Sequence, residues 1–349
     1  MLVDLRRGGV VESRHVVHVA VVDAEGRLVA RAGNPDLVTF WRSAAKPFQA
    51  LPLVTDGVAD RFGLTTAELA LCCASHSSEP GQVNLVRALL QKIGCGERDL
   101  TCGPHTPLSE TVAKDYQTRG VRLTAVYSNC SGKHAGMLAL ARHHGWPTEG
   151  YARLDHPVQR RCLAEVSRWT LVPEREIGVA VDGCGVACFA LPLRSMGLAY
   201  GRLGRDAGDG MRDATVPDAS RISHPASRVP HPASRIPHPA SRIVESMLRH
   251  PDLLAGEGRP CTEMMRAHPG RVITKVGAEG VYSALLTQER LGVALKIEDG
   301  HGPAAALAMA AVLRDLGLEP QPESLLATAT RNSRGEVVGE LRVNGGLLK

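Results

Sequence analysis

The chain has few lysines. Only seven of its 41 basic residues are lysine, and the other 34 are arginine. Codon bias accounts simply for such a preference. Where arginine is the default surface cation, however, we expect a retained lysine where an amine must lose its proton near neutral pH, because a guanidinium cannot do so.

Long apolar runs are also missing. None approaches the ~18 residues needed to span a bilayer, so we expect no membrane partner. The first residues, MLVDLRR, lack the apolar stretch of a signal peptide. The nine cysteines are an odd number, scattered from Cys72 to Cys261, and we expect reduced thiols. The net charge of +5 is too small to call for a nucleic-acid partner. These features together predict a cytoplasmic protein.

The order of the expected elements predicts an α+β fold. Hydrophobic residues make up 44% of the 349 residues and charged residues 22%, which is typical of a globular protein with a full core. The expected strands are 16–22, 27–31, 121–127, 177–181, 271–276, 280–287 and 291–297, and the main expected helices are 65–73, 82–93, 155–170 and 303–316, before a polar tail. We therefore expect one antiparallel sheet from both chain ends, covered by helices, with an inserted helical subdomain. A single catalytic domain, residues 1–349, would contain both subdomains.

Residues 222–242 form three near-copies of a seven-residue unit, ISHPASR, VPHPASR and IPHPASR. A heptad period is typical of coiled coils, but proline in every copy prevents a continuous helix. We interpret the segment as a tandem duplication in a flexible surface loop. Metal binding by its histidines is a weaker alternative, because equal spacing alone implies no convergent geometry.

Ser43 and Lys46 form a Ser-x-x-Lys motif. Their spacing places both side chains on one face of a helix. A lysine held neutral can take the proton of a serine hydroxyl, as in serine β-lactamases. Taken alone, the pattern is explained better by an ordinary helix start with a solvated lysine.

Four further segments concentrate chemically active side chains. Ser75 and His76 lie among hydroxyl residues after a buried helix, where a capped turn is an equally good explanation. Segment 128–137 carries a thiol, an amine and an imidazole before an apolar helix, without the spacing of a phosphate loop. Segment 182–188 combines glycines with two cysteines, which could form a tight turn with buried thiols. Lys275 begins a late Lys-x-Gly strand, as in β-lactamases, although an edge-strand lysine is the simpler explanation.

Together, the segments RSAAKPFQA, CCASHSSEP, SNCSGKHAGM, DGCGVACFALPL and KVGAEGVY resemble the rhizobial-type class of L-asparaginases. The resemblance implies a fold similar to that of serine β-lactamases and glutaminases, usually in a homodimer. The residues that it assigns to catalysis are the pairs Ser43 with Lys46 and Ser75 with Lys275. The residues that it assigns to a zinc ion are Cys130, Lys133 and Cys184. The residue that it places near the substrate is Asp182, to which we add Arg42 and His134 from the same motifs.

The implied zinc site is chemically consistent. Two thiolates, one neutral amine and a water would complete a four-coordinate zinc ion. A metal opposes protonation of the amine, which an arginine at position 133 could not lose. We expect such a zinc ion to tune substrate binding, because a serine nucleophile is already present.

The expected reaction is hydrolysis of the side-chain amide of L-asparagine to L-aspartate and ammonia. Ser43 would attack with Lys46 as base, and Ser75 with Lys275 would relay a proton to the leaving ammonia. A glutaminase is a close alternative, because one methylene changes binding by only ~1–3 kcal/mol. A β-lactamase or peptidase would share the Ser-x-x-Lys motif but works outside the cytoplasm. A non-enzymatic zinc-binding protein would release no ammonia.

Overall fold

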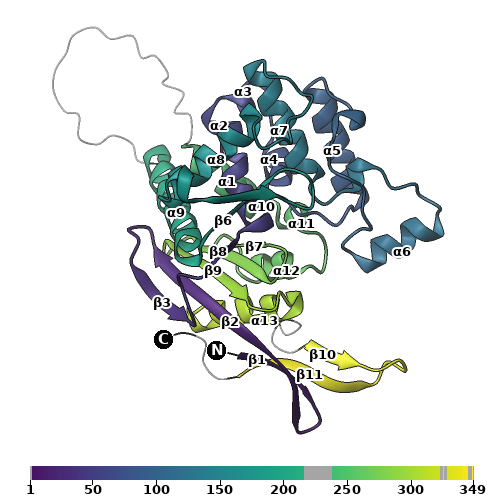
Figure 1. Cartoon of the computed structure of the whole chain (residues 1–349), viewed down its shortest axis with the longest axis vertical. Coiled ribbons are helices and arrows are strands. Elements are labelled where there is room, and N and C mark those ends of the chain that lie inside the picture. Colours follow the sequence, from purple (N-terminus) through teal and green to yellow (C-terminus); the bar gives the residue numbers. More distant parts are fainter. Residues whose placement is uncertain (1, 216–237, 323–324, 326–327, 345–347, 349) are drawn as a thin grey trace, which may run out of the picture.

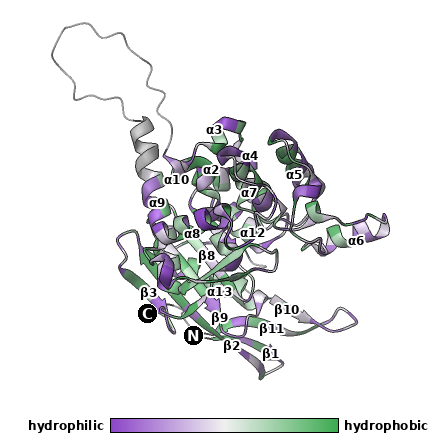
Figure 2. Cartoon of the chain, turned by 45° about the horizontal axis from the view of Figure 1, so that its top comes forward, coloured by the Kyte–Doolittle hydropathy of each residue, from purple (hydrophilic) through white to green (hydrophobic). Residues whose placement is uncertain are grey.

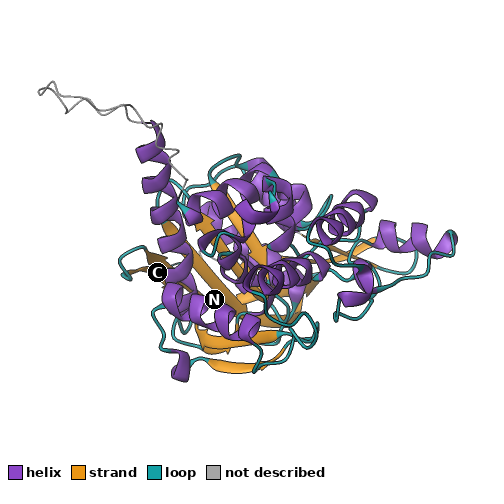
Figure 3. Ribbon diagram, turned by 90° about the horizontal axis from the view of Figure 1, so that it is seen from above, coloured by secondary structure: helices purple, strands orange, loops and turns teal. Residues whose placement is uncertain are grey.

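The computed structural model describes residues 2–215, 238–322, 325, 328–344 and 348. The residues 222–237 of the predicted repeat insertion therefore lie outside the described part. Both ends of the chain enter one sheet, and helices from the middle of the chain gather above it (Figure 1). Seen from above, these helices cover the strands (Figure 3). The α+β prediction is confirmed.

The large sheet contains eight strands within the described residues, in the order β10-β11-β1-β2-β9-β8-β7, with β3 paired to β2. Every pairing is antiparallel. The strands are β1 (Leu2–Arg7), β2 (Val10–Asp23), β3 (Leu28–Ala32), β7 (Val272–Val276), β8 (Val281–Leu286), β9 (Leu291–Ile297), β10 (Thr328–Arg331) and β11 (Val337–Asn344). The sheet is thus built from both chain ends, as predicted.

Helices occupy the middle of the chain and both faces of the sheet. The helical part contains α1 (Lys46–Ala50), α2 (Pro52–Thr55), α3 (Val58–Phe62), α4 (Thr66–Cys72), α5 (Pro80–Lys92), α6 (Glu110–Thr118), α7 (Ser131–His144), α8 (Pro157–Thr170), α10 (Pro239–Arg249) and α11 (Pro251–Leu254). The long helix α9 (Leu193–Thr215) packs on β2, β8 and β9, while α12 (Pro260–Ala267) packs on β7 and α13 (Gly302–Asp315) on β8 and β9. No helix of the described residues has the length and apolarity that a membrane crossing needs.

A small second sheet lies beside the helices. Its strands are β4 (Val38–Phe40), β5 (Gly178–Val181) and β6 (Ala187–Pro192), in the order β4-β6-β5. Two of the site segments adjoin it, because Arg42 follows β4 and Asp182 follows β5.

Strand β2 is buried on both faces of the large sheet. Ala20 and Val22 belong to the core shared with the helical part. Val19 and Val21 point to the other face and belong to the core beneath α13. This double burial explains the nearly continuous apolar run that predicted the strand. Figure 2 shows hydrophobic residues gathered in the central strands and the helices packed on them.

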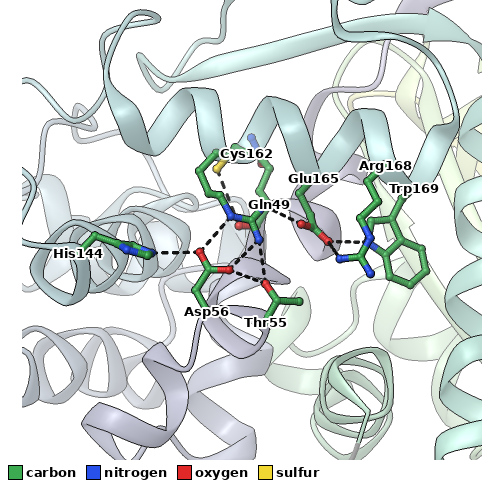
Figure 4. Close-up of polar contacts among 9 residues, drawn as sticks. Gln49, Thr55, Asp56, His144, Cys162, Glu165, Arg168 and Trp169 are labelled. Atoms are coloured by element: carbon green, nitrogen blue, oxygen red, sulfur yellow. Dashed lines mark hydrogen bonds and ion pairs between the residues drawn. The ribbon is translucent and has the colours of Figure 1, made fainter.

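A network of buried charges ties α8 to the end of α2 (Figure 4). Arg161 donates to Asp56 at 2.7 and 3.0 Å and to Glu165 at 2.6 Å. Glu165 also accepts from the indole of Trp169 at 2.7 Å. Burial works against ionisation of Asp56, but the hydrogen bonds from Arg161 lower the pKa of that carboxyl. The network fixes the helical part against which the site segments pack.

The structure departs from the predicted elements at several places, and β1, β4 and β6 are strands that the sequence pattern does not predict. Residues 121–127 form no strand and end in a single 3-10 turn. The expected polar tail contains β10 and β11, whose largely exposed residues leave little apolar signal. Residues 238–242 are not a loop: His238 caps α10 and Pro239 occupies its first turn, where proline is tolerated.

Candidate active site

The site begins at the loop that leaves α4. A capping box between Thr65 and Glu68 starts this helix, which is buried over its last residues. The chain then turns through residues 73–79 before α5 begins at Pro80. The backbone N–H of Ser75 donates to the carbonyl of Leu254 at 2.8 Å, which fixes this serine against α11.

The other polar side chains of the loop anchor it. Ser77 donates to the carbonyl of Ala255, and Ser78 donates to the carbonyl of Tyr127. The ring of His76 accepts from the backbone N–H of Ser78 and lies 2.8 Å from the hydroxyl of Ser131. Burial, followed by the charge of Lys46, lowers the pKa of His76 to about 3, so the ring is neutral. The predicted serine cap is wrong, because Glu79 caps α5 while Ser77 and Ser78 donate to carbonyls. These polar side chains tie the loop to its neighbours, and Ser75 contacts the lysine amines instead.

Ser75 lies between two lysine amines. Its Oγ is 2.9 Å from Nζ of Lys46, at the start of α1, and 2.8 Å from Nζ of Lys275, on β7. Lys46 also donates to the carbonyl of Ala74 at 2.6 Å. The three side chains are almost fully buried, at 0–3% exposure. Segments far apart in the sequence thus bring together three of the four predicted catalytic residues.

The surroundings of Lys275 lower the pKa of its amine to near neutral pH. Burial, reinforced by the nearby charge of Lys46, lowers the pKa of Lys275 from 10.5 to about 7. Keeping both amines protonated beside one buried hydroxyl would cost free energy, because it places two positive charges together in an apolar environment. The cluster therefore contains an amine that can act as a base near neutral pH.

Ser43, the fourth predicted catalytic residue, lies one 3-10 turn before Lys46. It is half-buried, and its carbonyl accepts the backbone N–H of Lys46. Among the described residues its hydroxyl has no hydrogen-bond partner, because the amine of Lys46 is directed to Ser75 and Ala74 instead. The pairing of Ser43 with Lys46 by a direct hydrogen bond is therefore not observed.

Arg42 has a strained backbone next to this serine. Its φ is 53°, in the left-handed region that a bulky residue rarely adopts. Its guanidinium lies 2.9 Å from Oδ1 of Asp182, in the turn between β5 and β6. Burial works against ionisation of Asp182, but Lys133 and then Arg42 lower the pKa of that carboxyl. Such strain is retained where the surroundings fix it, often at functional sites.

The three predicted metal ligands also converge. Nζ of Lys133, on α7, is 3.1 Å from Sγ of Cys184. Cys130 and Cys184 act on each other's thiol: Cys184 lowers the pKa of Cys130, and Cys130 raises that of Cys184. Burial opposes the charge of Lys133, but Cys130, Cys184 and Asp182 raise its pKa. The pKa shifts therefore favour negative charge on Cys130 rather than on Cys184, and positive charge on Lys133.

This donor set fits a zinc ion, since two sulfurs and an amine already lie together. In the described residues, no group of three or more histidine, cysteine or acidic side chains could hold a metal ion. Lys133 would therefore have to supply the third ligand as a neutral amine, so metal binding there would release its proton to solvent.

His134 follows Lys133 on α7 and is fully buried. Its Nδ1 lies 2.6 Å from the hydroxyl of Tyr151. Burial, then the charges of Lys133 and Lys46, keep the pKa of His134 well below its ordinary value. Tyr151 lies in none of the predicted motifs, and its only sequence signal is that it is one of five tyrosines in the chain.

Solved structures resemble the chain at low identity. A putative β-lactamase from Bacteroides dorei DSM 17855 is 13% identical with a TM-score of 0.38, over 82% of this chain and 86% of that one. A β-lactamase from Mycobacterium bovis is 18% identical with a TM-score of 0.35, over 83% of this chain and 90% of that one. A simvastatin synthase mutant from Aspergillus terreus is 15% identical with a TM-score of 0.34, over 83% and 87% of the two chains.

The comparison by family is more direct. No curated protein matches the sequence. The family described as L-asparaginase II matches residues 3–343, which include every site residue discussed above. The chain belongs to the L-asparaginase II family.

Proposed function

We propose that the protein hydrolyses the side-chain amide of L-asparagine to L-aspartate and ammonia through a serine nucleophile. One observation carries the proposal: the hydroxyl of Ser75 joins the amines of Lys46 and Lys275, and the pKa of Lys275 is about 7. This arrangement allows a proton to pass from one amine to the other through the Ser75 hydroxyl, without exchange with solvent. Family membership supports the substrate class.

Proton transfer through Ser75 accounts for activation of the nucleophile. A neutral Lys275 accepts the proton of the Ser75 hydroxyl, and Ser75 takes a proton from Lys46. Lys46 then holds a free lone pair, one helical turn from Ser43. Lys46 removes the proton of Ser43, whose oxygen attacks the amide carbon and forms an aspartyl ester as ammonia leaves. The relay returns a proton to the leaving nitrogen, and water hydrolyses the ester.

The charged pair beside the nucleophile suits an amino-acid substrate. Asp182 can accept the α-ammonium group of L-asparagine, and Arg42 can pair with its α-carboxylate. Both side chains keep some exposure, at 10% and 23%, so a substrate can reach them. Their mutual ion pair holds the two charges in place before the substrate binds.

A zinc ion remains part of the proposal. Cys130, Lys133 and Cys184 would hold it, and when bound it would supply a fixed positive charge beside the substrate. Elemental analysis of the protein purified with zinc tests this site: we expect about one zinc per chain, and near none in Cys130→Ser. Undiminished zinc in Cys130→Ser would refute the ligand set.

A coupled ammonia assay tests the activity. Wild-type protein should release ammonia from L-asparagine, and Ser43→Ala and Ser75→Ala should each lose nearly all turnover. Ser13→Ala, an exposed serine of β2, is the matched control and should keep it. Near wild-type turnover in Ser43→Ala would show that Ser43 is not the nucleophile.

The same assay separates the alternatives. Faster release from L-glutamine would favour a glutaminase, and release from neither amide would favour a non-enzymatic zinc protein. Hydrolysis of a β-lactam or cell-wall peptide would favour a β-lactamase or peptidase. The expected homodimer and cytoplasmic location are tested separately, by sedimentation velocity and by cell fractionation.

A further inference from the structure

A chain of hydrogen bonds leads from a backbone amide to the buried ring of His134. The backbone N–H of Thr101 lies 3.1 Å from the hydroxyl oxygen of Tyr151. That hydroxyl lies 2.6 Å from Nδ1 of His134. The side chains of Tyr151 and His134 are both 0% exposed, so solvent does not supply other partners.

The direction of these bonds follows from the groups themselves. A backbone N–H can only donate, so the Tyr151 oxygen accepts from Thr101. The single proton of the Tyr151 hydroxyl is then free to donate, and Nδ1 of His134 is the acceptor within reach. A neutral imidazole whose Nδ1 accepts must carry its proton on Nε2.

Nε2 of His134 is left without a partner. Within the described residues it is one of the few buried side-chain nitrogens that make no hydrogen bond. An unpaired buried donor is costly and calls for an explanation, such as a group that arrives with the substrate. His134 adjoins Lys133 on α7, whose amine contacts the Cys184 side of the site.

We infer that Tyr151 is a positioning residue that fixes His134 as an Nε2–H donor for an acceptor oxygen of the substrate. This inference rests on the proposed amidohydrolase function. The donor suits an amide carbonyl or a carboxylate oxygen and rejects an ammonium group, which has no lone pair. Tyr151 itself touches no substrate and acts only through the ring.

Histidine-labelled protein tests the tautomer without any activity. In 15N spectra of the full chain, we expect the His134 signal, assigned by its loss in His134→Gln, to show a proton on Nε2 and none on Nδ1. A proton on Nδ1 in wild-type protein would overturn the inference. This measurement stands even if L-asparagine is not the substrate, so failure of the proposed function is distinguishable from failure of this inference.

Kinetics test the role of the donor. The amide nitrogen of glutamine falls near Nε2 of histidine, whereas that of asparagine falls near Nδ1. His134→Gln should therefore keep a kcat/KM about 10-fold or more above that of His134→Asn, with the loss mainly in KM. Equal losses in the two variants would contradict a donor at Nε2.

Tyr151→Phe completes the test. It should lower kcat/KM by about 10-fold in the wild-type background. In the His134→Gln background it should have little further effect, because a glutamine has no tautomer to fix. Equal losses in both backgrounds would reduce Tyr151 to a packing role. Tyr282→Phe, which removes another buried hydroxyl on the far side of the large sheet, is the control and should leave kcat/KM unchanged.

Discussion

Replacing Lys275 by methionine should abolish activity and stabilise the protein at neutral pH. The folded chain holds this amine buried with its pKa near 7, whereas an unfolded chain exposes it with a pKa near 10.5. Below about pH 7 the lysine is protonated in both states, and the folded state bears the whole cost of the buried charge. At about 1.4 kcal/mol per pH unit, that cost is on the order of 5 kcal/mol.

The sign of the pH dependence follows from proton binding. Between about pH 7 and pH 10.5 the unfolded chain holds a proton on Lys275 that the folded chain has lost. Wild-type stability therefore rises with pH in this window relative to Lys275→Met. The stability gained by the variant is largest at or below pH 7 and shrinks by about 1.4 kcal/mol per pH unit above it.

Urea unfolding of both proteins between pH 6.5 and pH 9.5 measures this difference. Lys114→Met, which removes an exposed lysine of α6, serves as the control and should show no such trend. A stability difference between wild type and Lys275→Met that stays constant across the window would refute the assignment of a depressed pKa to Lys275. In parallel, wild-type kcat/KM should rise as pH passes about 7, because the base must be neutral.

Three substitutions away from the lysine pair should affect stability, each measured by urea unfolding. Gly132→Ala would place a Cβ 2.3 Å from the carbonyl oxygen of Leu71, so we expect a loss of about 3 kcal/mol, whereas Gly183→Ala has open space and should be neutral. Arg161→Met removes the cation shared by Asp56 and Glu165, which keep only His144 and the more distant Arg168, and should cost about 3 kcal/mol; a neutral result would contradict the network of Figure 4. His76→Ala removes the ring that anchors the Ser75 loop, so both stability, by about 2 kcal/mol, and kcat should fall; unchanged kcat would show that the loop is fixed without it.

The sheet could be predicted where the sequence pattern reports burial. The run 16–22 is predicted as a strand because both of its faces are covered, whereas β11 is mostly only partly buried and is predicted as a polar tail. The final residues of the repeat form a helix start, because His238 caps α10 and Pro239 is tolerated in its first turn once the rest of that helix packs. Local pattern therefore identified several elements with apolar faces. It missed the buried strand β6 and the helix α9 as well as elements fixed mainly by pairing or capping.

The sequence could predict which residues belong to the site, but not how they contact one another. The family resemblance pairs Ser75 with Lys275, and the structure shows this contact, but the resemblance does not indicate that Lys46 also contacts Ser75. Nor could the sequence distinguish Ser75 from Ser77, which anchors the loop, because the two differ in their partners rather than in their type. Tyr151 lies outside every motif and becomes visible only through its contact with His134.

The bridging serine and its second lysine are 200 residues apart, which affects how the protein acquires activity during synthesis. A ribosome adds residues in order, so Ser75 emerges long before β7 carries Lys275 to it. Strand β2 likewise emerges before β9, its antiparallel neighbour, so the edge of β2 that pairs with β9 stays unpaired until β9 has been made. On the proposed mechanism, a nascent chain is thus inactive until its C-terminal part has emerged. In the meantime it exposes an apolar strand edge, which is when chaperones are most needed.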